Sequence, residues 1–378
     1  MRSDWFKCKH ILCIRPDNLG DLLMSTPAIR ALKETFQCKI TVLTSSMAKP
    51  IVSMIPEIDD VIVFDLPWVK HKSQLSLEHF TYIIRELQYK QFDACVLFTV
   101  YSQNPLPTVM LAYSAGIPLR LAYCRENPYA LLTNWMPDQE PYTYVQHQVR
   151  RDLDLVASVG ASTRNELMSL DTSSCSANEV VQLLAHKGVD TQKPWLVLHT
   201  GVSEEKRKYP HQHWCKVGKL VIEALGYQVL LTGVMPEKAQ TDVLSQEIGA
   251  GAFSLAGDLT LPQFALLIKQ ASLVVSVNTA TIHIAAAVGT PVVVLYALTN
   301  PQHTPWKGKG KLLLYDVPQH LQSKNEVIRY VQDKMHPCVP EVPSPKKVVE
   351  AIQEVLSGKT DLLFPEVIPL RIPVNQDV

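Results

Sequence analysis

A glycine and a carboxylate follow the first apolar stretch of the chain. Residues 10–15 are apolar enough for a buried strand, Gly20 permits a tight turn, and Asp21 opens a helical pattern that runs to Phe36. Asp21 could cap that helix or complement its dipole. It could instead take the proton from an acceptor hydroxyl as a general base, provided that it reaches the acceptor oxygen. This segment alone leaves both interpretations open.

A second candidate segment, residues 198–210, is rich in cations. Small and hydroxyl residues with free backbone N–H groups end a strand there, and three cations follow, which together would neutralise a pyrophosphate. Glu204 and Glu205 precede the cations, so a solvated charged loop is the alternative. The candidate ligands are Thr200, Gly201, Ser203, Lys206, Arg207 and Lys208.

A third candidate segment, residues 276–287, runs from a strand into an Ala-rich helix. The unpaired N–H groups and the positive dipole end of such a helix suit a diphosphate. The alternative is that the polar residues are plain caps and that the histidine is a hydrogen-bonded core residue. The candidate ligand-binding residues of this segment are Asn278, Thr279, Ala280, Thr281 and His283.

The elements around these segments alternate between short buried strands and helices. This alternation predicts an α/β fold with parallel, doubly wound sheets, whose ligands lie at the carboxyl ends of the strands. From Leu119 to Tyr144 the pattern predicts loop structure near a cleft. The predicted strands are residues 10–15, 39–44, 61–64 and 94–99, then 195–199, 228–232, 273–277 and 292–296.

The length of 378 residues exceeds what one hydrophobic core usually organises, so two domains are expected. A polar break and Pro194 place the predicted boundary near Asp190. This gives an N-terminal domain over 1–189 and a C-terminal domain over 190–357. The apolar, Pro-rich tail over 358–378 is expected to pack back onto the first domain.

The composition excludes several classes of protein. Lys plus Arg and Asp plus Glu both total 36, so no overall charge would attract nucleic acid or an anionic bilayer. The N-terminus lacks the apolar core of a secretory signal, and no run reaches the roughly 20 apolar residues of a spanning helix, which predicts a cytoplasmic protein. The eight cysteines form no C-x-x-C pair, and His211 and His213 have no further ligand cluster nearby, so no metal site is expected.

Together, the three segments resemble glycosyltransferase family 9, the lipopolysaccharide heptosyltransferase family. ILCIRPDNLGDLLMSTPAIRALKETF resembles its opening strand, G-D turn and helix. LVLHTGVSEEKRKYPHQHW resembles the first strand of its second domain, and LVVSVNTATIHIAAAVGTPVVVLYALTNPQHT resembles its D-T-G-x-x-H-x-A-A nucleotide-sugar motif. The resemblance runs from Ile11 to His303.

This resemblance implies a GT-B architecture, in which two Rossmann-like domains face each other across a cleft. The domain over 1–189 would then lie on the acceptor side, and the domain over 190–357 would bind the nucleotide sugar. It implies an inverting transfer of a sugar, heptose or a relative, from an ADP-sugar to a lipopolysaccharide core or a related lipid-linked glycan. No metal or other cofactor and no nucleic acid would take part. The enzyme would be cytoplasmic, with transient contact at the inner membrane surface.

The resemblance also implies roles for individual residues. Asp21 matches the general base, and Arg207 stands where the family has the phosphate-binding lysine. Glu237 falls near the acidic residue at the nucleotide ribose, and Leu259 near the backbone position that meets the base. The candidates for binding the acceptor are Gly20, Lys70, Lys72 and Arg120.

Two positions depart from the family motif, because Asn278 and Ala280 replace its Asp and Gly. Asn lacks the charge of the carboxylate, and the added methyl group lies where the backbone meets the ligand. A nucleotide-sugar-binding protein that has lost turnover is therefore one alternative to an active transferase. A nucleotide-sugar epimerase of similar two-domain shape is another.

Overall fold

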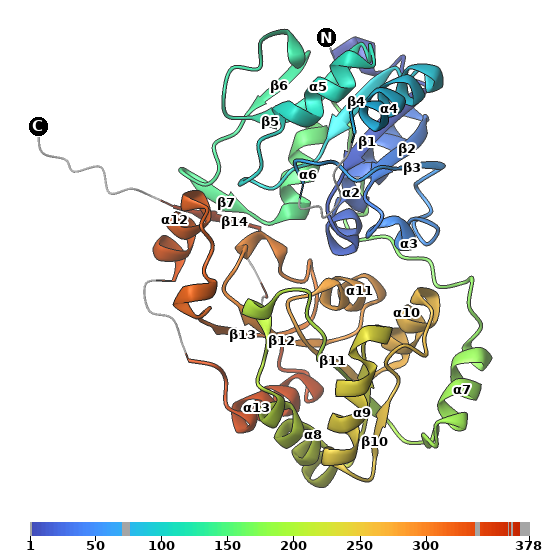
Figure 1. The fold of residues 1–378 in the computed structure, drawn as a ribbon, viewed down its shortest axis with the longest axis vertical. Helices are drawn as coiled ribbons and strands as arrows, with labels where there is room; N and C mark the ends of the chain where they lie inside the picture. The colour runs from blue at the N-terminus through green and yellow to red at the C-terminus, as the bar shows by residue number, and fades with distance from the viewer. Residues whose placement is uncertain (1, 70–75, 337–340, 362, 364–365, 371–378) are drawn as a thin grey trace, which may run out of the picture. The chain divides into compact units, whose positions relative to one another are not determined.

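The computed structural model describes the chain except for residues 1, 70–75, 337–340, 362, 364–365 and 371–378 (Figure 1). The chain forms two compact units, Met1–Ser169 with Glu366–Val378, and Leu170–Pro365. The helix α7 (Ala177–His186) packs on α10 (Leu261–Gln270) of the second unit. The segment before the predicted boundary at Asp190 is therefore grouped with the second unit.

The described part of the first unit contains a six-stranded parallel sheet in the order β3-β2-β1-β4-β5-β6. This is the strand order of a Rossmann fold, and the order reverses between β1 and β4. Ligands of such sheets bind outside the carboxyl ends of the strands at that switch point. In sheet order the strands are β3 (Asp60–Val63), β2 (Lys39–Thr44), β1 (His10–Arg15), β4 (Ala94–Leu97), β5 (Leu119–Cys124) and β6 (Asn134–Pro137).

Helices cover both faces of this sheet (Figure 1). One buried cluster joins alternate residues of β1 and β4 to Ile83 and Leu87 of α4 and to Val109 of α5. The longest of the described helices, α2, packs on α6, and a hydrogen bond joins Ser25 of α2 to Asp152 of α6, 127 positions away. The helices are α1 (Arg2–Trp5), α2 (Leu19–Phe36), α3 (Lys49–Val52), α4 (Leu77–Lys90), α5 (Leu106–Ser114) and α6 (Gln148–Ala157), with the 3-10 turn η1 (Tyr129–Leu131).

The described part of the second unit repeats this topology, in the order β10-β9-β8-β11-β12-β13 with all strands parallel. Its switch point lies between β8 and β11. The second and third candidate segments follow these two strands directly. In sheet order the strands are β10 (Ala252–Ser254), β9 (Gln228–Thr232), β8 (Trp195–His199), β11 (Leu273–Val277), β12 (Val292–Ala297) and β13 (Gly310–Tyr315).

The second core packs one sheet face against α8, α9 and α13, with Trp214, Leu244 and Ile352 among its buried members. The helices α10 and α11 pack on each other. The remaining elements are α8 (His211–Leu225), α9 (Lys238–Ile248), α11 (Ala280–Val288), α12 (Glu326–Met335) and α13 (Pro345–Leu356), with the 3-10 turns η2 (Glu205–Arg207), η3 (Met235–Glu237), η4 (Pro301–His303) and η5 (Gln319–Leu321).

The C-terminal segment contributes β14 (Val367–Pro369), which pairs antiparallel with β7 (Tyr144–Gln146) of the first unit. The predicted α/β fold with two doubly wound parallel sheets is confirmed. The prediction of loop structure over Leu119–Tyr144 is wrong, because β5 and β6 complete the first sheet there. β5 is buried along most of its length, so its side chains lack the alternation that marks a half-exposed strand.

Candidate active site

Asp21 occupies the first turn of α2, just beyond the carboxyl end of β1. Its Oδ2 accepts a hydrogen bond from the Asn18 backbone N–H at 3.0 Å, which is the capping contact that its position predicts. Its Oδ1 lies 3.5 Å from Nη2 of Arg15, and 12% of the side chain is exposed. The carboxylate therefore caps the helix, pairs with a cation and still reaches solvent.

Arg15, the last residue of β1, has a fully buried side chain. Its Nε lies 3.1 Å from Oδ2 of Asp17, whose Oδ1 accepts a hydrogen bond from Gln103 after β4. Asp152 of α6 also lies within electrostatic range of this guanidinium. Burying a guanidinium requires compensating negative charge, and the switch point of the first unit provides it.

In the second unit, the turns after β8 and β9 meet around one carboxylate. A Cβ on Gly201 would lie 2.3 Å from both carboxylate oxygens of Glu237, and a Cβ on Gly233 would lie 2.7 Å from its Oε2. The same Oε2 accepts a hydrogen bond from the Val234 N–H at 2.8 Å. Two predicted site residues, Gly201 and Glu237, are thus in contact, and the glycines leave the room that Glu237 fills.

Arg207 lies at the N-terminus of α11. Its Nη1 donates a hydrogen bond of 3.0 Å to the carbonyl of Asn278, the residue before the N-cap Thr279. The Thr279 side chain makes no capping hydrogen bond and instead lies 3.3 Å from the hydroxyl of Ser276. A guanidinium therefore lies beside a helix N-terminus that its own N-cap side chain leaves uncapped, and both features favour an anion.

The Asn278 side chain is held by groups at the end of β12. Its Nδ2 donates to the Ala297 carbonyl at 3.2 Å and to Oγ1 of Thr299 at 3.0 Å. Its Oδ1 is buried and accepts no hydrogen bond from the described residues. A carbonyl only accepts hydrogen bonds, so an aspartate could not make the contact to Ala297. The asparagine that replaces the aspartate of the family motif therefore makes a hydrogen bond that an aspartate could not make.

A family model described as glycosyltransferase family 9 (heptosyltransferase) matches residues 80–332, more than half of the chain. The chain belongs to glycosyltransferase family 9. The resemblance noted in the sequence is confirmed, and the protein is a glycosyltransferase.

Full-length relatives agree with this assignment. Lipopolysaccharide heptosyltransferase 2 of Salmonella typhimurium is 24% identical over 356 residues, covering 92% of this chain and 98% of the relative. The solved structure of a family 9 glycosyl transferase from Veillonella parvula matches with a TM-score of 0.71 at 16% identity, over 93% of this chain and 97% of that one. That of E. coli ADP-heptose lps heptosyltransferase II matches with a TM-score of 0.67 at 21% identity, over 93% and 99%. These structures share the GT-B fold with this glycosyltransferase.

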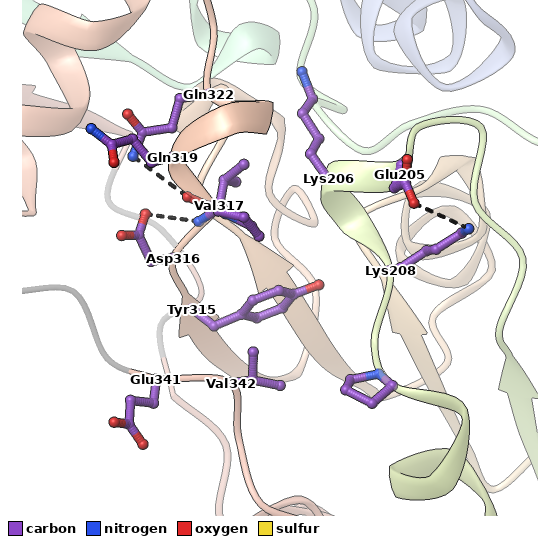
Figure 2. Close-up of a pocket in the computed structure, with 12 residues that line it drawn as sticks. Glu205, Lys206, Lys208, Tyr315, Asp316, Val317, Gln319, Gln322, Glu341 and Val342 are labelled. Atoms are coloured by element: carbon purple, nitrogen blue, oxygen red, sulfur yellow. Dashed lines mark hydrogen bonds and ion pairs between the residues drawn. The ribbon is translucent and has the colours of Figure 1, made fainter.

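The basic turn of this glycosyltransferase separates its three cations. Arg207 contacts Asn278, whereas Lys206 and Lys208 line an open pocket of about 860 Å³ within the second unit. Figure 2 shows the 205–210 turn on one side of this pocket, residues 315–322 on the other, and the Tyr315 ring at its base. The Tyr315 hydroxyl donates to the Arg207 carbonyl at 2.9 Å, which ties the turn to the end of β13.

The turn also contains the internal ion pairs expected of a solvated charged loop, which was the alternative interpretation of this segment. Glu204 lies 3.1 Å from Arg207 and 3.3 Å from Lys206, and Glu205 lies 3.8 Å from Lys208. The turn carries a net charge of one positive unit from these five residues. An incoming phosphate would therefore share Arg207 with Glu204.

Arg120, which is predicted to bind the acceptor, makes its hydrogen bonds within the first unit. It lies near the amino end of β5, at the edge of the sheet opposite Asp21, and is largely buried. Its guanidinium donates to the backbone carbonyls of Leu131 and Ala130 at 2.6 and 2.8 Å, and also to that of Ile117. Arg120 therefore holds the η1 connection in place. The other proposed acceptor cations, Lys70 and Lys72, lie outside the described residues.

The other predicted residues lie in the first turn of α2, in α11 and in turns of the second unit. Gly20 is buried in the first turn of α2, and Thr281 and His283 are buried in α11. Thr200, Ser203 and Leu259 lie in partly or fully exposed turns at the carboxyl edge of the second sheet.

Among the described residues, no group of three or more His, Cys, Asp or Glu side chains could hold a metal ion. In the same part of the chain, no helix combines the length and apolar character needed to cross a membrane.

Four polar residues that no sequence motif singled out lie at the two switch points. Arg15, Asp17 and Asp152 gather beside Asp21, and His199 ends β8 with its Nδ1 3.0 Å from Oγ1 of Thr232. Burial lowers the pKa of His199 to about 4, so its ring is neutral at physiological pH. The sequence did hold one signal for the first of these clusters, because Arg15 is a charged residue at the end of a largely apolar strand.

Proposed function

We propose that this glycosyltransferase moves a heptosyl group from an ADP-activated donor to a lipopolysaccharide core saccharide or a related lipid-linked glycan. The observation that carries the proposal is the Arg207 guanidinium beside the N-terminus of α11. The names of the relatives supply the sugar, the nucleotide and the class of acceptor. The setting would be the cytoplasm, at the membrane surface that carries the acceptor.

The donor would bind in the second unit, with its diphosphate at the N-terminus of α11. Backbone N–H groups of Ala280 and Thr281, the helix dipole and Arg207 would contact the phosphate oxygens. Glu237, wedged between two glycine turns, would accept hydrogen bonds from the ribose hydroxyls, and the base would lie near Leu259. Lys206 and Lys208 would add positive charge from the pocket side of the turn.

Asp21 would act as the general base of the first unit. The acceptor oxygen attacks the anomeric carbon as its proton passes to the Asp21 carboxylate. The bond from that carbon to the phosphate oxygen breaks, and its electron pair leaves with ADP. Attack on the face opposite the leaving group inverts the anomeric configuration. Arg207 and the N-terminus of α11 would stabilise the charge on the departing diphosphate, so no metal is required by this proposal.

The test compares Asp21→Asn with the parent protein in a transfer assay with ADP-heptose and a core oligosaccharide. Asn keeps the size of the side chain but cannot accept the proton at neutral pH. We expect kcat to fall by about 10²- to 10⁴-fold while the donor Kd, measured by calorimetry, stays within a factor of about two. Equal turnover by the two proteins would remove Asp21 from the mechanism.

The same assay separates this function from the two alternatives. A protein that binds ADP-heptose but transfers it to no acceptor would be the catalytically impaired binding protein that Asn278 and Ala280 suggest. An epimerase would release an isomerised sugar without any acceptor present. The hydrogen bonds of Asn278 favour the active transferase, because they make this asparagine a fitted part of the site.

A further inference from the structure

The switch point of the first unit concentrates negative charge around one buried cation. Among the described residues, the charged groups that face Arg15 are Asp17 on the loop after β1, Asp21 on α2 and Asp152 on α6. One guanidinium thus faces three carboxylates. The guanidinium stabilises the ionised form of all three. A change in the charge of one carboxylate therefore changes how strongly Arg15 stabilises the other two.

Asp152 is the most deeply buried of the three. Its Oδ2 accepts a hydrogen bond of 2.6 Å from the Ser25 hydroxyl of α2, and its Oδ1 accepts one of 2.8 Å from Gln148. The neighbouring cation on α6, Arg151, contributes less, because it pairs with Asp138 and Glu140. Burial raises the pKa of Asp152 to about 6, so its charge changes within the working range of a cytoplasmic enzyme.

Ser25 links Asp152 to the catalytic turn. The same hydroxyl that bonds Asp152 lies 3.3 Å from the backbone carbonyl of Asp21, one helical turn earlier on α2. The pairing of Arg15 with Asp21 is longer, at 3.5 Å, than its pairing with Asp17, at 3.1 Å. Arg15 therefore attracts Asp21 less strongly than it attracts Asp17. The pairing with Asp21 is the more sensitive of the two to a competing carboxylate.

We infer that Arg15 is a positioning residue that fixes the Asp21 carboxylate, and that Asp152 sets how much of the charge of Arg15 reaches Asp21. This inference rests on the proposed role of Asp21 as general base. Ionised Asp152 competes for Arg15 and repels the negative charge on Asp21, so it makes Asp21 a stronger base. Protonated Asp152 does the reverse.

The test is Asp152→Asn, which removes the negative charge and keeps the shape. The new Nδ2 can donate to the Ser25 hydroxyl, which can still donate to the Asp21 carbonyl, so the variant is expected to fold. Loss of a nearby negative charge makes ionised Asp21 a weaker base. Because Asp152 of the parent carries its charge only above about pH 6, kcat of Asp152→Asn should be about two- to fivefold lower above that pH and close to the parent value below it.

Asp154→Asn is the matched control, because it removes a carboxylate from the same helix at a site that faces Arg150, Gln146 and solvent. Its kcat profile should coincide with that of the parent. A kcat above pH 6 that is unchanged or higher in Asp152→Asn would overturn the inference. Thermal unfolding of both variants checks that they fold.

A second measurement needs no turnover. In protein labelled with 13C at the aspartate carboxyl carbon, the Asp21 signal is assigned by its loss in Asp21→Asn and followed against pH. In the parent this signal should show a second step near pH 6, where Asp152 ionises, and the step should be lost in Asp152→Asn and kept in Asp154→Asn. A step that is missing in the parent, or that persists in Asp152→Asn, sinks the inference. An Asp21→Asn enzyme with full activity would instead remove the proposed general base while leaving this titration result intact.

Arg15 itself is tested by two substitutions. Arg15→Met removes the cation, so the acidic limb should move to higher pH and kcat should fall more than donor affinity. Arg15→Lys keeps a charge without the forked geometry and should restore part of kcat and most of the limb position. If Arg15→Lys and Arg15→Met give identical profiles although both fold, charge at Arg15 does not act on Asp21.

Discussion

The two switch points of this glycosyltransferase share one strand order but carry opposite charge. In the first unit, three carboxylates surround a buried guanidinium where β1 ends. In the second, Arg207 lies beside the N-terminus of α11 where β8 and β11 end. The topology fixes where a ligand can bind, and the few residues after each strand decide whether that place accepts a proton or attracts an anion.

The two regions also differ in how firmly their charges are held. The groups of the first unit are buried, and Asp152 is fixed by hydrogen bonds from two elements. The cations of the second unit lie on a partly exposed turn, paired with Glu204 and Glu205. The proposed general base must keep one geometry, whereas the proposed phosphate-binding turn can exchange an internal ion pair for a ligand.

Arg207→Met should produce the largest effect in the second unit. It removes the guanidinium beside the N-terminus of α11 and leaves most of the side-chain volume. We expect kcat/KM to fall by about 10²- to 10³-fold, because the charge on the departing diphosphate loses a stabilising cation. The acidic limb of the pH profile should stay in place, since that limb belongs to the first unit.

The control for this variant is Lys208→Met, which removes a cation whose side chain is 62% exposed in the pocket wall. Its effect should be much smaller, because solvent screens an exposed charge. Equal losses from the two substitutions would mean that the net charge of the turn matters and that the position beside α11 does not.

Asn278→Asp should have a smaller effect and tests whether the departure from the family motif is fitted to this site. The new carboxylate would face the Ala297 carbonyl, which Asn278 now contacts at 3.2 Å. Loss of that bond and repulsion between two acceptors should reduce the free energy of unfolding by about 1 to 3 kcal/mol. Urea denaturation measures this change, and donor affinity should fall with it. A more stable and more active variant would show that the asparagine impairs the site.

Much of this arrangement could be predicted from the sequence. The three segments stand out because each combines a buried strand with an abrupt change to polar residues, and both are local signals. Asp152 gave no such signal, because its partner Ser25 is 127 residues away. The contacts of Arg120 gave no local signal either, since the carbonyls that it contacts become neighbours only when η1 folds back on β5. β5 was missed because Arg120 interrupts the apolar run by which the other buried strands are predicted.

The contact between Gly201 and Glu237 is a further feature that only the fold reveals, and Gly201→Ala tests it. The added Cβ would lie 2.3 Å from both carboxylate oxygens, so Glu237 must move and its bond to the Val234 N–H must break. The donor should lose the equivalent of one hydrogen bond, an increase in Kd of about three- to tenfold. If displacement of Glu237 is the cause, Gly201→Ala combined with Glu237→Gln should bind ADP about as weakly as the weaker single variant. Additive losses in the double variant would show that the methyl group obstructs the nucleotide directly, and Gly201 would then belong to the binding surface itself.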